Sequence, residues 1–217
     1  MCILQEFAEC PYILELVDYG RNVDANQICL GLEWMDIGSL CNVKTYSMAE
    51  IQYISKCVLT ALDALHSALY VHNDVKPDNI LISSEGDVKL IDFGCTMKME
   101  DATKPLTKPV GSIRYHSFEK RFCSPVRYTT KSDIYSFGIT VAEMFNGDHT
   151  KCQNTRTLYD HYFVTTSPTL RANKDPLFDD FVAKCLEQDA DARWSAAQLL
   201  EHPFLETAPA LVRFSKE

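Results

Sequence analysis

Two short apolar runs joined by a tight turn constrain the fold of this chain more than any other feature. The runs cover residues 80–82 and 88–91, and residues 83–87 between them have the serine, glycine and aspartate content of a turn. This pattern predicts a β-hairpin. Asn79 precedes the first strand and Asp92 follows the second, so the hairpin should bring their oxygen atoms to one end. Two such ligands can share Mg²⁺ with substrate phosphates.

The loop before the hairpin carries two more side chains that suit phosphoryl transfer. Asp74, Lys76 and Asn79 fall within six residues of one another. A carboxylate can accept the proton of an attacking hydroxyl, and an ammonium group can neutralise charge on the transferred phosphoryl group. A turn or cap role is the structural alternative for each residue taken singly. Their combination with Asp92 at this spacing favours the chemical interpretation.

Residues 72–79 read HNDVKPDN, and residues 92–94 read DFG. Together these strings resemble the catalytic and metal-binding loops of eukaryotic protein kinases. The resemblance implies an α+β, protein-kinase-like fold, with a mostly α-helical C-terminal lobe and a remnant of the β-sheet N-terminal lobe. It also implies transfer of the γ-phosphate of ATP to Ser or Thr of a protein substrate in an intracellular signalling cascade, with ATP and Mg²⁺ as cofactors. Lys76-Pro77 favours Ser or Thr over tyrosine as the acceptor.

The resemblance gives each polar residue of these loops a role. Asp74 would be the catalytic base, and Lys76 would support the γ-phosphate of ATP. Asn79 and Asp92 would bind Mg²⁺ and, through it, the nucleotide.

Five further residues would hold these loops in place: His72, Gly94, Glu119, Asp133 and Arg193. Glu119 ends a Ser-Phe-Glu string that stands where the family usually has Ala-Pro-Glu. It would form a buried bidentate ion pair with Arg193. Asp133 would accept backbone N–H bonds from the loop around His72. A position favoured by the helix dipole is a second reason for an acid at Asp133, and both reasons can hold.

The same resemblance divides the chain, expected to be one partial kinase domain over residues 1–217, into a remnant of the N-terminal lobe (1–32), a hinge (33–40) and the C-terminal lobe (41–217). At the hinge, backbone groups around Glu33 and Met35 would bind adenine, and Leu32 would limit the depth of the pocket. Such a site needs an extended segment with free N–H and C=O groups beside an apolar slot.

Local patterns predict the remaining elements. A first helix should end at Pro11, followed by a strand at 12–17, a turn at 18–20 and a strand at 27–32. Helices are expected from a capping box at 47–50 to about His66, from Lys131 to about Phe145, from Asp175-Pro176 onward, and from a second capping box at 195–198 to a stop before Pro203.

The segment after Gly94 carries two threonines four residues apart, Thr103 and Thr107. This spacing, the string at 35–40 and the stretch at 128–138 are closest to the mitogen-activated protein kinase kinase type, which implies Thr103 and Thr107 as candidate phosphosites for an upstream kinase. Asn73 stands where the family usually has the arginine that would receive such a phosphate.

Residues 103–131 hold seven basic residues against one acid. A solvated loop surface and a site for phosphate or an acidic substrate are both open interpretations of this segment.

The kinase pattern is incomplete in one respect. The sequence has no glycine-rich phosphate loop, no strand lysine and no partner glutamate before the hinge. A kinase-like scaffold or binding module that lacks this phosphate clamp is therefore the alternative to an active enzyme.

Composition excludes several classes of protein. The net charge of −9 argues against nucleic acid or an anionic membrane as a partner, and no stretch of 18 apolar residues predicts a membrane span. Nine cysteines show no paired metal spacing, which favours reduced thiols over disulfides or zinc. With no secretory signal at the N-terminus, we expect a cytoplasmic protein.

Overall fold

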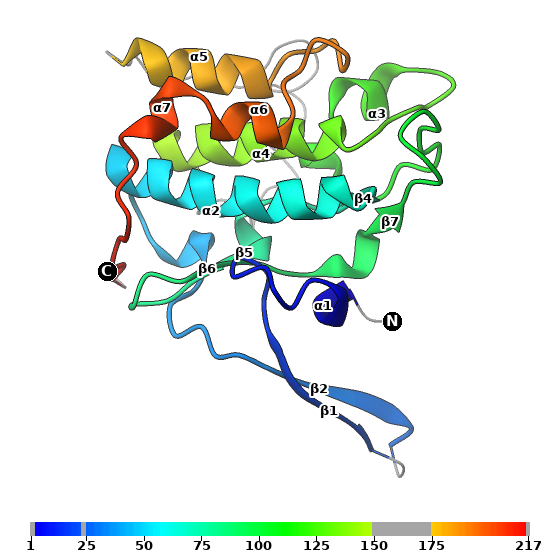
Figure 1. The fold of residues 1–217 in the computed structure, drawn as a ribbon, viewed down its shortest axis with the longest axis vertical. Coiled ribbons are helices and arrows are strands. Elements are labelled where there is room, and N and C mark those ends of the chain that lie inside the picture. Colours follow the sequence, from blue (N-terminus) through cyan, green and yellow to red (C-terminus); the bar gives the residue numbers. More distant parts are fainter. Residues whose placement is uncertain (1–2, 23–24, 149–174, 216–217) are drawn as a thin grey trace.

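A computed structural model describes residues 3–22, 25–148 and 175–215. A stack of helices forms one layer of the molecule, and short strands lie along one side of it (Figure 1). The described helices are α1 (Ile3–Glu6), α2 (Met48–Ser67), α3 (Phe118–Phe122), α4 (Lys131–Asn146), α5 (Pro176–Cys185), α6 (Ala196–Leu200) and α7 (Pro203–Glu206), with short 3₁₀ turns at Leu40–Asn42, Pro77–Asn79, Phe93–Cys95 and Ile113–Tyr115.

Helix α2 forms where its capping box predicts. The Ser47 side chain accepts from the backbone N–H of Glu50, and the Glu50 side chain accepts from the backbone N–H of Ser47, which satisfies two donors that a helix start leaves free. The predicted apolar stripe is buried: Ile51, Ile54, Val58, Ala61, Leu62 and Leu65. This stripe packs against α4 and α6, so α2 forms one side of the core.

Helix α4 is the central element, because nearly all its residues are buried. It packs on α2 and α5. Gly138 allows close packing against α5, since a Cβ there would lie 2.6 Å from the Cβ of Cys185. Helix α5 begins as predicted, with Asp175 capping the N–H groups of Leu177 and Phe178 and Pro176 in the first turn.

The described strands form three small antiparallel sheets. One contains β3 (Gly38–Ser39), β5 (Ile80–Ile82) and β6 (Val88–Leu90) in that order, and another pairs β4 (Tyr70–Val71) with β7 (Met97–Lys98). The predicted hairpin is confirmed, with Ile80 opposite Leu90 and Ile82 opposite Val88. Both strands are largely buried and β6 packs against α2, which makes the hairpin a rigid support.

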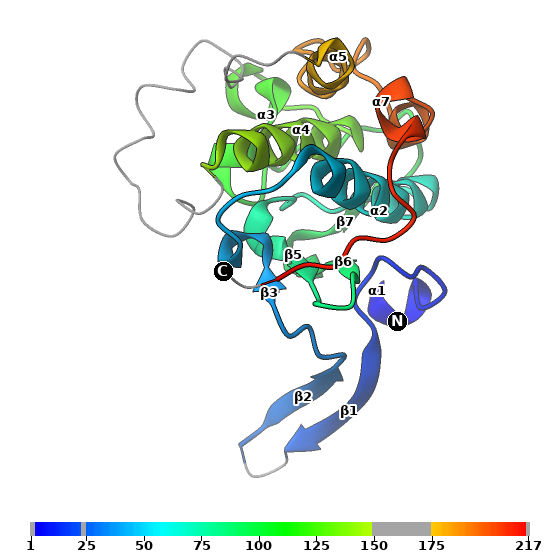
Figure 2. The same cartoon turned by 90° about the vertical axis from the view of Figure 1, so that its left-hand side faces the viewer.

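The third sheet is a hairpin of β1 (Leu16–Asn22) and β2 (Gln27–Leu32), and it projects away from the helices (Figures 1 and 2). Strand β2 has the predicted bounds. The turn predicted at 18–20 is wrong, because these residues continue β1 opposite residues 29–31. The chain turns near Asn26 instead, whose φ of 49° suits an asparagine. Of the strand predicted at 12–17, Leu16 and Val17 begin β1, and Ile13 forms an isolated bridge to Leu90.

The C-terminal segment crosses back over the β5–β6 turn (Figure 2). Phe214 is buried, and its ring lies 6.3 Å from that of Tyr53, whose hydroxyl donates to the carbonyl of Gly86. Only glycine fits at position 86, where φ is 102° and a Cβ would lie 2.2 Å from the carbonyl oxygen of Val212. The helix predicted from the capping box at 195–198 is α6, and it ends before Pro203 as expected. It is not the last helix, because α7 starts at this proline.

Among the described residues, no helix is long and apolar enough to cross a membrane. The seven cysteines that the structure describes are free thiols, which agrees with the interpretation from their spacing.

Candidate active site

The loop between β4 and β5 places Asp74 at the centre of a polar cluster. Its Oδ2 accepts from Lys76 Nζ at 2.7 Å and from Asn79 Nδ2 at 3.0 Å, and its Oδ1 accepts from the backbone N–H of Ser112 at 2.7 Å. Burial alone would raise the pKa of this carboxyl, but the hydrogen bonds from Lys76 and Ser112 outweigh it and hold the pKa below its ordinary value. Asp74 is therefore an oriented carboxylate at neutral pH.

Asp133, at the start of α4, anchors the loop between β4 and β5 to this helix. Its two carboxylate oxygens accept the backbone N–H groups of His72 and Asn73, each at 2.8 Å, and Oδ2 also contacts His66 Nε2 at 2.9 Å. Burial opposes the charge on Asp133, yet hydrogen bonding and the positive potential of His66 keep its pKa lowered. The predicted contact between Asp133 and the loop around His72 is present.

His72 fills the space between the two loops. Its Nε2 lies 3.0 Å from the carbonyl oxygen of Ile91, its Nδ1 accepts from the backbone N–H of Asp74, and its ring meets Phe93 edge-on. Burial lowers the pKa of His72, so the imidazole is neutral and spans the catalytic and Asp-Phe-Gly loops. This arrangement suits the structural role expected from the sequence.

Asn79 and Asp92 stand at the same end of the β5–β6 hairpin, as predicted. The backbone N–H of Ile91 donates to the carbonyl oxygen of Asn79 at 3.0 Å, which ties the two ends together. Asp92 is exposed in the left-handed region at φ 61°, and its Oδ1 accepts from the backbone N–H of Gly94 at 3.2 Å. One carboxylate and one amide oxygen fit Mg²⁺, which takes oxygen ligands and completes its shell with water and phosphate.

No group of three or more His, Cys, Asp or Glu side chains in the described part of the chain could hold a metal by itself. A magnesium ion at Asn79 and Asp92 would take its further ligands from water and substrate phosphates. That ligand set is typical of Mg²⁺ in phosphoryl-transfer sites.

Sequence reasoning missed the part that residues 111–112 play. The Ser112 hydroxyl accepts from Lys76 Nζ at 2.9 Å, so this serine contacts both Lys76 and Asp74. Gly111 has a φ of 92°, and a Cβ there would lie 2.0 Å from the carbonyl oxygen of Asn73. A Gly-Ser pair after a segment of loop composition is the only sequence signal for this contact, and it indicates a turn equally well.

The ion pair between Glu119 and Arg193 is present in the bidentate form that was predicted. The distances are 2.9 Å from Nη1 to Oε1 and 3.0 Å from Nη2 to Oε2. Further guanidinium bonds go to the carbonyls of Glu187, Gln188 and Lys131. The pair fastens α3 and the segment before it to the helical body.

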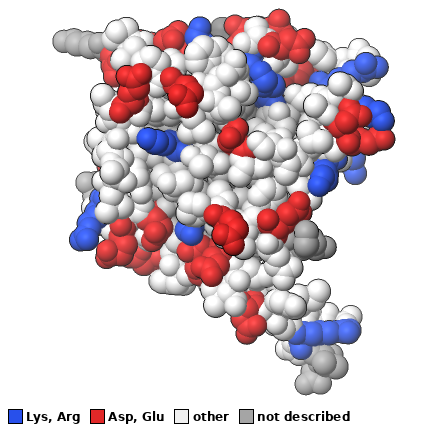
Figure 3. Space-filling model, in the orientation of Figure 1, with Lys and Arg blue, Asp and Glu red and all other residues white. Residues whose placement is uncertain are grey.

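In the basic segment at 103–131, most of the cations have partners within the chain, which weighs against a site for phosphate or an acidic substrate there. Arg114 pairs with Glu143, and Lys104 pairs with Glu100. Arg121 donates to the carbonyls of Ile113 and Arg114, Lys120 to Asn73, and Lys131 to the carbonyl of Arg193. Acidic and basic side chains are interspersed on the face that Figure 3 shows.

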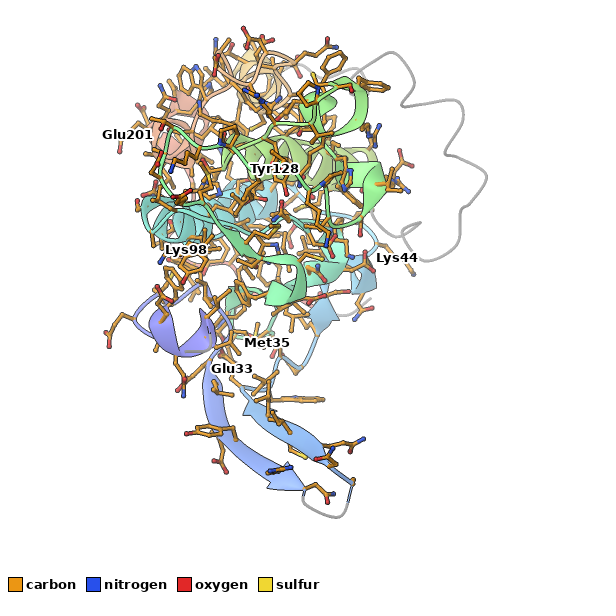
Figure 4. All side chains as sticks on the ribbon, turned by 90° about the vertical axis from the view of Figure 1, so that its right-hand side faces the viewer. Glu33, Met35, Lys44, Lys98, Tyr128 and Glu201 are labelled. Carbon is orange, nitrogen blue, oxygen red and sulfur yellow. The ribbon has the colours of Figure 1, made fainter. Side chains whose placement is uncertain are left out.

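The residues predicted to form the hinge lie where the β1–β2 hairpin joins the body (Figure 4). Met35 is buried, whereas Leu32 is 43% exposed. The backbone N–H of Glu33 donates to the carbonyl of Glu15, and its carboxylate pairs with Lys89 at 2.8 Å. The Glu33 backbone N–H is therefore already bonded within the chain.

Thr103 and Thr107 are both exposed. The Thr103 hydroxyl donates to Asp101 Oδ1 at 2.6 Å. Thr107 follows Leu106, whose backbone pairs with that of Tyr128. Both hydroxyl-bearing residues thus lie on the surface of the segment between the Asp-Phe-Gly loop and Ser112.

Comparison with known proteins agrees with this geometry. The chain matches the protein kinase domain over residues 1–205. It belongs to the protein kinase family. The α+β kinase-like fold expected from the sequence is therefore confirmed, and Asp74, Asn79 and Asp92 occupy the loops of a kinase domain.

Several curated Ser/Thr protein kinases are similar to this protein kinase domain. Serine/threonine-protein kinase pak-1 of Caenorhabditis elegans is 35% identical over 193 residues, covering 86% of this chain and 33% of the relative. STE20 of Yarrowia lipolytica is 36% identical, covering 82% of this chain and 16% of the relative. Sid1 of Schizosaccharomyces pombe is 34% identical, covering 88% of this chain and 41% of the relative. The chain thus spans less than half the length of each of these proteins.

Proposed function

We propose that this chain carries the catalytic loops of an ATP-dependent protein kinase that phosphorylates Ser or Thr of a protein substrate. The observation that supports this most is the position of Asp74, whose carboxylate is fixed by Lys76, Asn79 and the backbone of Ser112. A carboxylate that is oriented and ionised can accept the proton of a substrate hydroxyl. Similarity to Ser/Thr kinases supports this acceptor class.

The other residues of the cluster have distinct tasks in this proposal. Lys76 neutralises charge on the γ-phosphate, and Asn79 and Asp92 hold Mg²⁺. An ion held there would supply positive charge that offsets the charge of the phosphate oxygens. His72, Gly94, Asp133 and the Glu119–Arg193 pair keep these groups in register, because phosphoryl transfer depends chiefly on positioning and electrostatics.

The domain limits also belong to this proposal: residues 1–32 as the remnant of an N-terminal lobe, 33–40 as the hinge and 41–217 as the C-terminal lobe. ATP would bind with its adenine against the hinge, near the Glu33 carbonyl and Met35, with Leu32 beside it. A cytoplasmic location fits this activity. Closeness to the mitogen-activated protein kinase kinase type stays a prediction, since the relatives named above are of other types.

We further propose Thr103 and Thr107 as sites for an upstream kinase. Their exposure supports access. Leu106 and Tyr128 form an antiparallel bridge. Thr107 follows Leu106 and the exposed Arg127 precedes Tyr128, so the antiparallel register puts Thr107 opposite Arg127. A phosphate there could bind this guanidinium. Replacing both threonines by alanine should abolish any activation by an upstream kinase, and unchanged activation would exclude these sites.

The proposed function is tested by supplying γ-labelled ATP with three peptides that differ only in a Ser, Thr or Tyr acceptor. We expect label on the Ser and Thr peptides in the presence of Mg²⁺ and none after chelation with EDTA. Label on the tyrosine peptide alone would contradict the acceptor class. Binding of peptide or MgATP without transfer to any acceptor would instead support the scaffold alternative.

A further inference from the structure

Asn73 occupies a central position in the loop before Asp74. It is buried, with a φ of 72°, a left-handed conformation that asparagine tolerates better than most residues. Its backbone N–H is held by Asp133 Oδ1 at 2.8 Å. Its carbonyl oxygen faces Gly111, where no side chain would fit. The backbone of Asn73 thus joins α4 to the segment that carries Ser112.

The side-chain amide of Asn73 joins two more elements. Its Nδ2 donates to the carbonyls of Val71 at 3.2 Å and Cys95 at 3.0 Å, and its Oδ1 accepts from Lys120 Nζ at 2.7 Å. Cys95 directly follows the Asp-Phe-Gly loop, and Lys120 lies in α3. One amide, using both donors and its acceptor, therefore links the catalytic loop, the Asp-Phe-Gly loop and α3.

Lys120 is only 5% exposed, which is unusual for a lysine. Burial lowers the pKa of its ammonium group, while nearby Asp133, Glu119 and Asp74 oppose this effect. The Tyr128 ring lies 4.3 Å from Nζ and supports the cation from one side. A buried ammonium needs hydrogen-bond acceptors, and the described acceptor is Asn73 Oδ1.

The neighbouring residue Glu119 is bonded to Arg193, which anchors α3, the helix that carries Lys120. The segment between the Asp-Phe-Gly loop and α4 therefore contacts the catalytic loop at two points. Gly111 and Ser112 contact Asn73 and Asp74 at one point, and Lys120 contacts Asn73 at the other.

We propose that Asn73 and Lys120 are positioning residues that act as one unit, called here the Asn73–Lys120 latch. The latch couples α3 to the catalytic loop and keeps Asp74 and Ser112 in contact without any phosphate on the segment. This inference rests on the proposed kinase function for its effect on turnover. Its structural part stands on the contacts alone.

The latch is tested with Asn73→Gly, Lys120→Met and the double variant. Glycine removes the amide without straining the positive φ, and methionine keeps most of the lysine's length without its charge. Each single variant should lower kcat for peptide phosphorylation by about tenfold or more, with little change in KM for ATP. If the two residues act as a unit, the double variant should be no worse than the worse single variant.

Lys108→Met is the matched control, because Lys108 lies exposed in the same segment and should leave kcat unchanged. If kcat of the double variant falls by a factor equal to the product of the two single-variant factors, the proposal is overturned. Single variants that fold normally and keep the kcat of the parent protein would also overturn it. Should Lys120→Met fail to fold, Asn73→Gly alone decides by the same kcat criterion.

Hydrogen exchange at the Ser112 amide gives a readout that does not require turnover. This amide donates to Asp74 Oδ1, so loss of the latch should speed its exchange by about tenfold in both single variants, with no further gain in the double variant. Unchanged exchange would overturn the latch even if the protein is an active kinase. An inactive parent protein with faster exchange in the variants would refute the kinase function and leave the latch supported.

Discussion

Arg193 and Glu119 meet through two parallel hydrogen bonds, although 74 residues separate them in the chain. The Arg193 side chain is fully buried, and that of Glu119 is 9% exposed. Burial would raise the pKa of Glu119, but the Arg193 guanidinium outweighs it and holds this pKa below its ordinary value. The pair therefore fixes α3 beside the catalytic loop with both partners charged.

Breaking this pair should destabilise the protein strongly. In Glu119→Gln the guanidinium loses its counter-charge in a buried site, and we expect a loss of about 3–5 kcal/mol in the free energy of unfolding. Urea unfolding measures it. Asp63→Asn is the control, since this acid on α2 lies outside the buried stripe of the helix and should change stability by less than about 0.5 kcal/mol. A loss below 1 kcal/mol for Glu119→Gln would contradict the anchoring role.

Acid should remove part of the stability through Glu119 and Asp133, whose pKa values are both lowered on folding. In the unfolded chain the pKa is about 4.3 for the glutamate and about 3.9 for the aspartate. Their contribution is thus complete above those values, declines as the pH falls below them, and is gone below the folded pKa values. Urea titrations at a series of pH values check this. Glu119→Gln should have a shallower decline with acid than the parent protein, and an identical slope would exclude Glu119 as a contributor.

Gly111→Ala should impair activity because the added Cβ would collide with the Asn73 carbonyl at 2.0 Å, and because φ at this position is 92°. We expect kcat to fall by about tenfold or more, since Ser112 would be displaced from Asp74. Gly20→Ala is a matched control in β1, where a Cβ would meet nothing within 4 Å. Equal activity of the two variants would show that the contact at Gly111 has no effect on catalysis.

Phe214→Ala should show that the C-terminal segment is part of the core. The ring is buried beside Tyr53, and large-to-small changes of a buried phenylalanine cost about 3–5 kcal/mol. Thermal unfolding should register a clear drop in Tm. Trp34→Ala, at an 86% exposed aromatic residue, should leave Tm nearly unchanged. Similar Tm values for the two variants would mean that the segment contributes little to stability.

Prediction from the sequence worked best where a local pattern determines the structure. The capping box at Ser47, the cap at Asp175 and the hairpin that joins Asn79 to Asp92 each depend on neighbouring residues, and each is present. It failed at residues 18–20, because Asp, Tyr and Gly have the composition of a turn, whereas pairing with β2 extends them as a strand.

Contacts between distant residues were accessible only through resemblance to a family. The Glu119–Arg193 and Asp133–His72 contacts could be expected in that way. The bonds of Asn73 with Lys120 and of Ser112 with Asp74 could not, since both depend on how the segment folds back over the catalytic loop. Nothing in the local sequence distinguishes buried Lys120 from exposed Lys108.

The central claim is that Asp74 accepts the proton of a substrate hydroxyl, and one measurement tests it most directly. Phosphate transfer from ATP to a Ser peptide is compared between the parent protein and Asp74→Asn, with thermal unfolding to show that both are folded. The account predicts a loss in kcat of about 10²–10⁴, with KM for ATP and Tm little changed. A folded Asp74→Asn protein that transfers phosphate at the rate of the parent would contradict it.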